Sequence, residues 1–180
     1  MPRPGEYERL VFFAPPEAAE PVRAWLPGVR LLPQSGADLG ARMSAAFTRA
    51  FERGAGRAAI IGTDTPAISR ATVAVALDAL DEADVVVGPA EDGGYYLLAL
   101  RQPLPELFEG VAWSTPAVLE ETLARAEHRA LRVRQLTRLR DIDTPADLQA
   151  EWPRVRPLLE AHPDLRRQIE EWLARTADGG

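Results

Sequence analysis

Residues 85–100 read VVVGPAEDGGYYLLAL, and this stretch decides the fold class. It begins with Val85–Gly88, a run rich in β-branched residues that is typical of a strand covered on both faces. A second apolar run, Tyr95–Leu100, predicts another strand. The acidic and glycine residues between them, Glu91 to Gly94, mark a turn. Two apolar strands of this kind belong to the interior of a domain.

Outward from this pair, strands alternate with helices along the chain. Further strands are expected at 10–14, 29–33, 58–62 and 131–136. Helices are expected after Asp38, after Ser69, from Pro116 to about Arg129, and from Thr144. This alternation predicts an α/β fold with three α/β/α layers around a mainly parallel sheet.

The chain divides into a domain and an extension. Its 180 residues, 46% of them hydrophobic, are enough for one α/β domain over residues 1–150. Over residues 151–180 the pattern changes, and prolines are expected to divide the segment into short helical pieces. Leu165, Ile169 and Trp172 form an apolar stripe that predicts a helix packed on the domain. A contact in a homodimer is the alternative interpretation.

The composition excludes several classes of protein. No cysteine is present, which rules out disulfides, thiolate zinc sites and a catalytic thiol. The net charge is −6 without a visible basic patch, which argues against nucleic-acid binding. Every basic side chain apart from two histidines is arginine. No signal peptide or membrane-length apolar stretch is seen, so we expect a cytoplasmic protein without a membrane partner.

Carboxylates follow two of the expected strands. In open α/β sheets, ligands bind beyond the carboxyl ends of the strands, and Thr63 and Asp64 lie at such an end. Magnesium in proteins is commonly held by one or two carboxylates and substrate phosphates. Asp64 is therefore a candidate metal ligand, although an aspartate before a proline also commonly closes a turn.

Asp143 is the candidate second carboxylate. The residues after it, Thr144 to Asp147, predict a helix start with a capping box. That cap does not explain Asp141 and Asp143, which repel each other unless a positive charge lies nearby. Either a metal ion or the neighbouring Arg138 and Arg140 would supply that charge.

The turn at Glu91–Gly94 has two interpretations. Asp-Gly is a strong hairpin-turn signal, which needs no function. Glycines also let a ligand approach the backbone, and Asp92 is able to accept hydrogen bonds from sugar hydroxyls. His128 and His162 have no partner at a spacing suited to metal binding and are expected on the surface.

Taken together, five motifs resemble a known family. They are PQSGADLGARM, IGTDTP, VVGPAEDGGYYLLAL, WST and DIDTPADL, and they span roughly Leu10 to Leu148. In order and spacing they resemble the bacterial GT-A-fold, nucleotide-diphospho-sugar-transferase-like proteins linked to arsenosugar biosynthesis. A more distant resemblance reaches guanylyltransferases of molybdopterin and phospholactate metabolism.

The resemblance implies a role for each matching residue. Mg²⁺ or Mn²⁺ would bind Asp64 and Asp143, and Asp92 would act at the reacting sugar. The implied substrate-binding residues are Thr63, Gly93, Gly94, Trp113, Ser114, Thr115, Gln34 and Arg42.

Three functions agree with these features. The first is a metal-dependent glycosyltransferase that moves a sugar from a nucleotide-sugar to an unknown acceptor. The second is a nucleotidyltransferase, and the third a non-catalytic nucleotide- or metal-binding or assembly protein. The third is favoured by the N-terminus, because the chain starts at what resembles the family's second strand and the usual nucleotide-binding loop is expected to be missing. In that case we expect Leu10–Ala14 to take an interior place in the sheet.

Overall fold

A computed structural model describes residues 7–177 of the protein. Its strands are β1 (Leu10–Phe13), β2 (Arg30–Pro33), β3 (Ala58–Ile61), β4 (Val85–Pro89), β5 (Tyr95–Leu100) and β6 (Val133–Gln135). Its helices are α1 (Ala19–Trp25), α2 (Leu39–Glu52), α3 (Arg70–Ala79), α4 (Val118–His128), α5 (Pro145–Leu158) and α6 (Pro163–Ala177). Two short 3₁₀ turns, η1 (Pro16–Ala18) and η2 (Pro105–Leu107), complete the described elements.

The main sheet has four strands in the order β3-β5-β4-β6. Strand β5 is antiparallel to both β3 and β4, whereas β4 and β6 are parallel. Strands β3, β4 and β6 therefore run in one direction, and β5 is the single reversed strand of this sheet. The expected α/β fold is confirmed, with three of the four strands sharing one direction.

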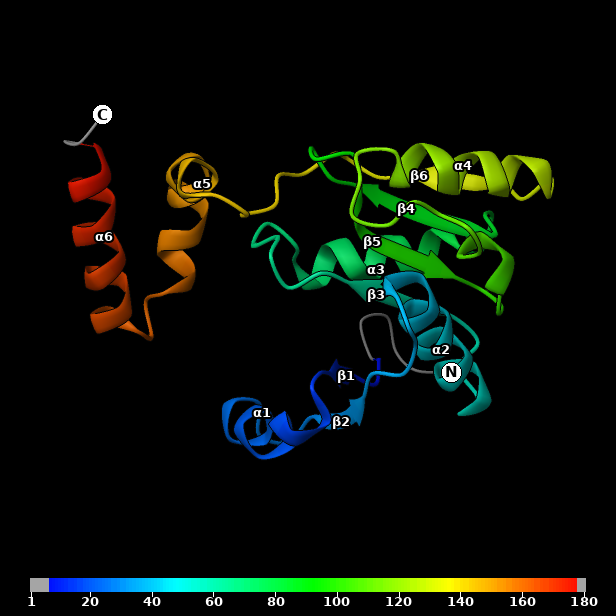
Figure 1. The fold of residues 1–180 in the computed structure, drawn as a ribbon, viewed down its shortest axis with the longest axis horizontal. Coiled ribbons are helices and arrows are strands. Elements are labelled where there is room, and N and C mark those ends of the chain that lie inside the picture. Colours follow the sequence, from blue (N-terminus) through cyan, green and yellow to red (C-terminus); the bar gives the residue numbers. More distant parts are fainter. Residues whose placement is uncertain (1–6, 178–180) are drawn as a thin grey trace.

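The side chains of the central strands build a core on each face of the sheet. Val85 and Val87 of β4 belong to a cluster with Phe47 of α2 and Leu119 of α4. Val86, which points to the opposite face, packs with the α3 side of the molecule. Figure 1 shows the resulting layers, with the sheet between these helices.

Three predicted helix starts have the caps that the sequence indicates. Asp38 accepts a hydrogen bond from the Ala41 amide at 2.7 Å. Ser69 and Thr144 each form a capping box with the residue three positions later. These contacts satisfy backbone amides that the first helical turn otherwise leaves without acceptors.

The prediction for the first strand is wrong. Strand β1 pairs in parallel with β2 in a separate two-stranded sheet and does not enter the four-stranded one. Its side chains are only partly buried except for Phe13. An interior place would require two neighbouring strands, and the described residues give β1 one.

The C-terminal segment also differs in detail from its prediction. Helix α5 continues through Pro153 and Pro157 instead of breaking into short pieces. Each proline removes one backbone hydrogen bond, but its fixed φ is close to the helical value. The most extensive contact of α6 is with α5, and Leu165 is 47% exposed. Within residues 7–177, no helix has both the length and the apolar character to cross a bilayer.

Candidate active site

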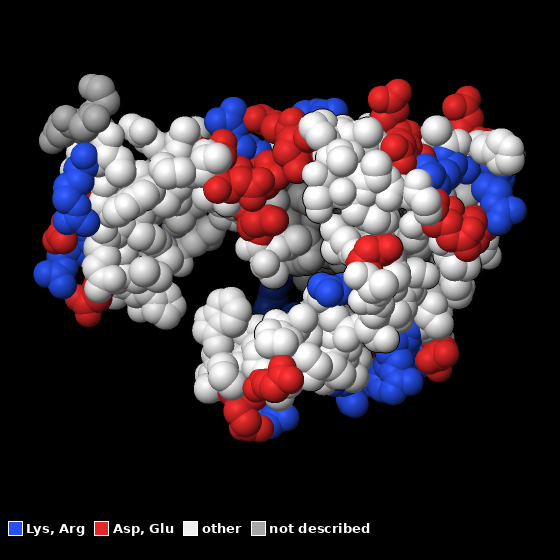
Figure 2. Space-filling view, viewed as in Figure 1, with Lys and Arg blue, Asp and Glu red and all other residues white. Residues whose placement is uncertain are grey.

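The shared direction of β3, β4 and β6 brings their carboxyl ends to one edge of the sheet. Asp64 follows β3, Asp92 follows β4, and Asp141 and Asp143 follow β6. Figure 2 shows acidic side chains gathered where the chain leaves the sheet toward α5. Four carboxylates from three separate segments thus face one region, as expected for the ligand-binding edge of such a sheet.

Three of these residues form a compact acidic cluster. Ligand oxygens of Asp92, Asp141 and Asp143 all lie within 4.8 Å of one another. A donor set made only of carboxylate oxygens suits a hard cation such as Mg²⁺ or Mn²⁺. Asp92 and Asp143 are exposed and Asp141 is half-buried, so a cation could reach the cluster from solvent.

Asp64 lies beside the cluster and is not one of its three members. Its carbonyl oxygen accepts a hydrogen bond from the Ile142 amide at 3.0 Å, which holds the loop after β3 against the Asp141–Asp143 segment. Its side chain folds back over Gly62. Thr63 precedes it on the same exposed loop.

The electrostatics of the cluster are those of an uncompensated negative site. Burial raises the pKa of the Asp141 carboxyl above its usual value, and the charges of Asp92, Asp143 and Asp64 raise it further. A hydrogen bond with its own backbone amide opposes these effects. The protein therefore brings these carboxylates together at an electrostatic cost that a bound cation would remove.

The turn that carries Asp92 is held in place by its glycines. Gly93 has a φ of 92°, and a Cβ added to it would meet the Pro116 carbonyl oxygen at 2.2 Å. The Gly93 carbonyl accepts a hydrogen bond from the Leu119 amide at 2.9 Å. At Gly94 the backbone amide donates to the Asp92 carboxylate at 2.8 Å. Only glycine fits at position 93 without a shift of the chain.

The Trp113–Thr115 segment directly precedes Pro116, which contacts the Gly93 turn, and its tryptophan packs against the start of α2. A Cβ added at Gly40 would lie 2.4 Å from the indole nitrogen of Trp113, so the ring lies directly against the α2 backbone. Ser114 has a φ of 62°, which is unfavourable for a non-glycine residue. The Thr115 hydroxyl donates to the Ala112 carbonyl at 2.7 Å.

The amides at the start of α4 are already engaged. The Ala117 amide donates to the Thr115 hydroxyl, and the Leu119 amide donates to Gly93. The Val118 amide donates to the Thr115 carbonyl at 3.3 Å. These three donors are consequently not available to an anion.

Gln34 and Arg42 contact each other instead of the acidic cluster. The Arg42 guanidinium donates to the Gln34 side-chain oxygen and to the Gly36 carbonyl, both at 3.3 Å. The Gln34 amide group donates to the Phe12 carbonyl at 3.3 Å. Among the hydrogen bonds of residues 7–177, none joins either side chain to the four aspartates.

Two arginines tie the Asp92 turn to the segment that carries Asp141 and Asp143. Arg140 pairs with Glu91 at 2.8 Å, and its guanidinium lies 4.0 Å from Asp147. Arg138 donates to the Ala90 carbonyl at 2.6 Å. A backbone bridge between Ala90 and Leu139 reinforces the contact. The positive charge expected near Asp141 and Asp143 is thus partly committed to Glu91.

Sequence reasoning had not placed Asp141 among the metal ligands. The signal for it was the unexplained repulsion between Asp141 and Asp143, which the structure extends to Asp92. The predicted pairing of Asp64 with Asp143 stays a prediction.

Comparison with known proteins identifies the family. Residues 2–115 match the model of a family described as an uncharacterized protein conserved in bacteria, DUF2064. The protein belongs to this family. A search of curated proteins finds no match.

Solved structures show which fold the chain shares. A protein from Desulfovibrio desulfuricans G20, described as a candidate nucleotide-diphospho-sugar transferase, is 32% identical with a TM-score of 0.78, over 90% of this chain and 77% of that one. Rv0371c from Mycobacterium tuberculosis H37Rv, determined in complex with manganese, is 19% identical with a TM-score of 0.51, over 78% of this chain and 74% of that one. The first comparison confirms a fold like that of nucleotide-diphospho-sugar transferases, and the second supports the fold alone.

Proposed function

We propose that this DUF2064 protein is a metal-dependent transferase that uses a nucleotide-sugar as donor. The observation that carries the proposal is the cluster of Asp92, Asp141 and Asp143, with ligand oxygens within 4.8 Å of one another. It lies at the carboxyl ends of the strands in a fold similar to that of a candidate nucleotide-diphospho-sugar transferase. The manganese complex of the Rv0371c protein agrees with a divalent cation in this fold.

The residues present fit such a cation. The donor set contains only carboxylate oxygens. Burial raises the pKa of Asp141 most, and the neighbouring carboxylates raise it further by a repulsion that a cation relieves. When bound, Mg²⁺ or Mn²⁺ would neutralise the diphosphate and serve as a Lewis acid toward the leaving nucleotide. The three aspartates would hold the ion, and Asp64 would lie next to it. The Gly93 turn would keep Asp92 in position and leave the backbone open to the sugar.

The proposal gives Asp92 and Asp64 roles that differ from those implied by the family resemblance. Asp92, expected at the reacting sugar, becomes a cation ligand in the proposal. Asp64, expected as a ligand, becomes a neighbour whose substitution should weaken cation binding less than that of Asp143. The link to arsenosugar biosynthesis stays a prediction.

The test is cation and nucleotide binding by thermal shift. Mn²⁺ with UDP, GDP or ADP should raise the melting temperature by roughly 5–10 °C at a hundred times the Kd, since a ligand that binds only the folded state stabilises it. Asp143→Asn should remove the shift. Asp78→Asn, which removes an equal charge from the exposed side of α3, should leave it unchanged.

Two outcomes would contradict the proposal. One is the absence of any shift with Mn²⁺ alone or with all three nucleotides. The other is an equal loss of the shift in Asp78→Asn and Asp143→Asn, which would indicate diffuse attraction to an acidic protein. Either outcome would favour a non-catalytic role for the fold.

A further inference from the structure

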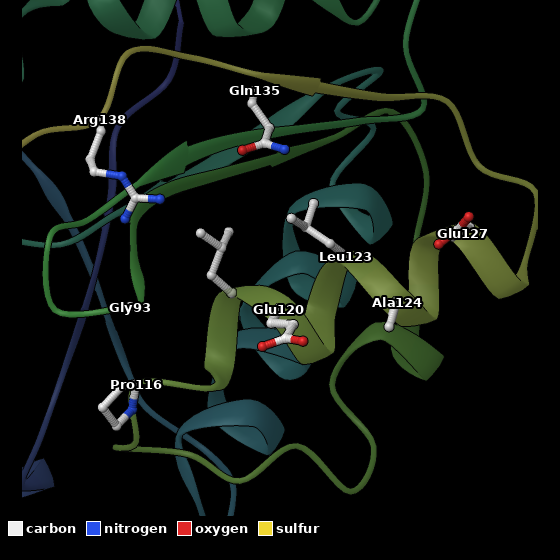
Figure 3. A pocket seen from close by; sticks show the side chains of 9 residues that line it. Gly93, Pro116, Glu120, Leu123, Ala124, Glu127, Gln135 and Arg138 are labelled. Carbon is white, nitrogen blue, oxygen red and sulfur yellow. The ribbon is translucent and has the colours of Figure 1, made fainter.

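A groove of about 510 Å³ lies beside the acidic cluster, on the far side of the Gly93 turn. Gly93 and Pro116 form its end nearest to Asp92, α4 forms one wall, and the β6 side forms the other (Figure 3). This volume is within the range of small-molecule sites. Gly93 lines the groove, and Asp92 directly precedes it in the chain. A ligand in the groove would therefore lie next to a group bound at the cluster.

The floor of the groove is apolar. It consists of Leu119 and Leu123, which are four residues apart and share the sheet-facing side of α4, whereas Ala124 lies about 100° further round the helix, beyond Glu120. Leu119 is buried and Leu123 is half-buried, whereas Ala124 is exposed and belongs to the open rim of the groove. An apolar floor suits the C–H face of a small ring or chain.

Arg138 supplies the positive charge of the groove. Figure 3 shows its guanidinium directed from the β6 side toward the groove. In the described part of the chain it donates one hydrogen bond, to the Ala90 carbonyl, and pairs with no carboxylate, in contrast to Arg140. Arginine has five N–H donors, so most of them remain for an anionic ligand. The contact with Ala90 holds the guanidinium in a fixed position.

Acceptors of hydrogen bonds surround the rest of the groove. Glu120 and Glu127 lie along α4, and the Gln135 amide faces them from β6 (Figure 3). Two carboxylates disfavour a ligand that is anionic along its whole length. They favour hydroxyl groups, which donate to carboxylates. The groove thus offers one cationic end and a polar rim suited to hydroxyls.

We propose that this groove binds the acceptor of the transfer reaction, a small polyhydroxylated acid such as a sugar acid or sugar phosphate. The acceptor role rests on the proposed function. An acceptor hydroxyl oxygen forms the bond to the anomeric carbon while the bond from that carbon to the diphosphate oxygen breaks. The nucleoside diphosphate leaves with the electron pair, and the hydroxyl proton is released. Arg138 contacts Ala90 and so lies at the Gly93 end of the groove, where it holds the anionic group; the reacting hydroxyl is one next to that group, and the remaining hydroxyls extend along α4 toward Glu127.

The experiment is amide NMR of the metal-free protein in EDTA, titrated with gluconate, glucose 6-phosphate and glucose. We expect saturable shifts at Gly93, Leu119, Leu123 and Ala124 with the anionic probes. Glucose should bind at least about tenfold more weakly, because it lacks the charge-assisted hydrogen bond to Arg138. The tighter of the two anions tells whether the natural group is a carboxylate or a phosphate.

Three variants make the test specific. Arg138→Gln should weaken both anions at least about tenfold. Arg134→Gln removes the same charge from β6. Side chains alternate along a strand, so Arg134, next to Gln135, points away from the groove, and this variant should bind both anions as the wild type does. Ala124→Glu places a further carboxylate on the exposed rim without disturbing the core and should abolish anion binding. This variant keeps the test valid if Arg138→Gln loosens the Ala90 turn.

The outcomes separate this proposal from the proposed function. Equal loss in Arg138→Gln and Arg134→Gln, or shifts unchanged by Ala124→Glu, overturns the groove as the site. No anion binding in a protein that binds Mn²⁺ overturns the groove and leaves the metal proposal standing. Anion binding in a protein that never binds Mn²⁺ supports the groove as a ligand site and removes the transferase interpretation.

Discussion

The acidic cluster is assembled from two segments that are held in very different ways. Asp92 lies on a turn locked by packing, where Gly93 fits against Pro116 with no room for a Cβ. Asp141 and Asp143 lie on an irregular connector between β6 and α5. Their segment is attached by backbone hydrogen bonds of Ile142 and Leu139 and by the contacts of Arg138 and Arg140. One half of the cluster is fixed by close packing, and the other mainly by polar contacts.

This difference indicates how such a site would work. A rigid half fixes one carboxylate in advance, and this lowers the entropy cost of binding a cation. An adaptable half lets the other two carboxylates adjust to the cation and to the nucleotide. We call the Asp92–Gly93 turn the locked half and the Asp141–Asp143 segment the connector half. Substitutions in the locked half should change the free energy of unfolding through packing, and those in the connector half should change it through charge.

The largest effect is expected for Gly93→Ala in the locked half. The new Cβ would meet backbone atoms of Pro116, and alanine at a φ of 92° is strained, so we expect a loss of about 3 kcal/mol in the free energy of unfolding. Urea denaturation measures it. Gly56→Ala is the matched control, since nothing lies within 4 Å of its added Cβ. A loss below about 1 kcal/mol would mean that the turn is not locked.

Gly40→Ala tests the second contact of the same half. The added methyl group would overlap the Trp113 indole, but a side chain can move where backbone cannot. Overpacking costs about 1–3 kcal/mol, and the better helix propensity of alanine returns up to about 1 kcal/mol. We expect a net loss of about 1 kcal/mol. Trp113→Ala in the same chain should restore stability to that of Trp113→Ala alone; an additive loss would contradict the contact.

The locked half was harder to predict from sequence than the fold. Continuous apolar runs such as Val85–Gly88 and Tyr95–Leu100 indicated the strands, because burial on both faces leaves a local pattern. The caps at Asp38, Ser69 and Thr144 also leave a local pattern, because each one joins residues only three positions apart. By contrast, the contact of Gly93 with Pro116 joins residues that are distant in the chain, and no local pattern shows it.

The candidate site was predicted in part. The aspartates were recognised by their places after strands, but strand order decides which of them meet. The reversed strand β5 and the neighbouring positions of β4 and β6 bring Asp141 and Asp143 to Asp92. The Gln34–Arg42 contact and the separate β1–β2 sheet likewise depend on tertiary pairing.

Asp141→Asn tests the connector half through pH, in protein freed of metal with a chelator. Because the folded-state pKa of Asp141 is raised, its favourable contribution is present below the unfolded pKa and is lost as pH rises through the folded pKa. The variant should therefore be more stable than the wild type at pH 7, by about 0.5 kcal/mol, or roughly 1–2 °C, with the difference vanishing near pH 3.5. Saturating Mn²⁺ should reverse the order. Equal stability at every pH would contradict the repulsion.

The smallest effect is expected where the two halves meet, at the ion pair between Glu91 and Arg140. Glu91 precedes Asp92, and Arg140 precedes Asp141, so the pair spans the cluster at 2.8 Å. Both side chains are exposed by more than a third, and exposed pairs contribute about 0.2–1 kcal/mol. A double-mutant cycle with Glu91→Gln and Arg140→Gln, measured by urea denaturation, should give a coupling of about 0.3 kcal/mol. Salt at 1 M should reduce it, since exposed charges are screened. A coupling above about 1.5 kcal/mol that persists in salt would show that the connector is as firmly fixed as the Gly93 turn, and the contrast between the two halves would be wrong.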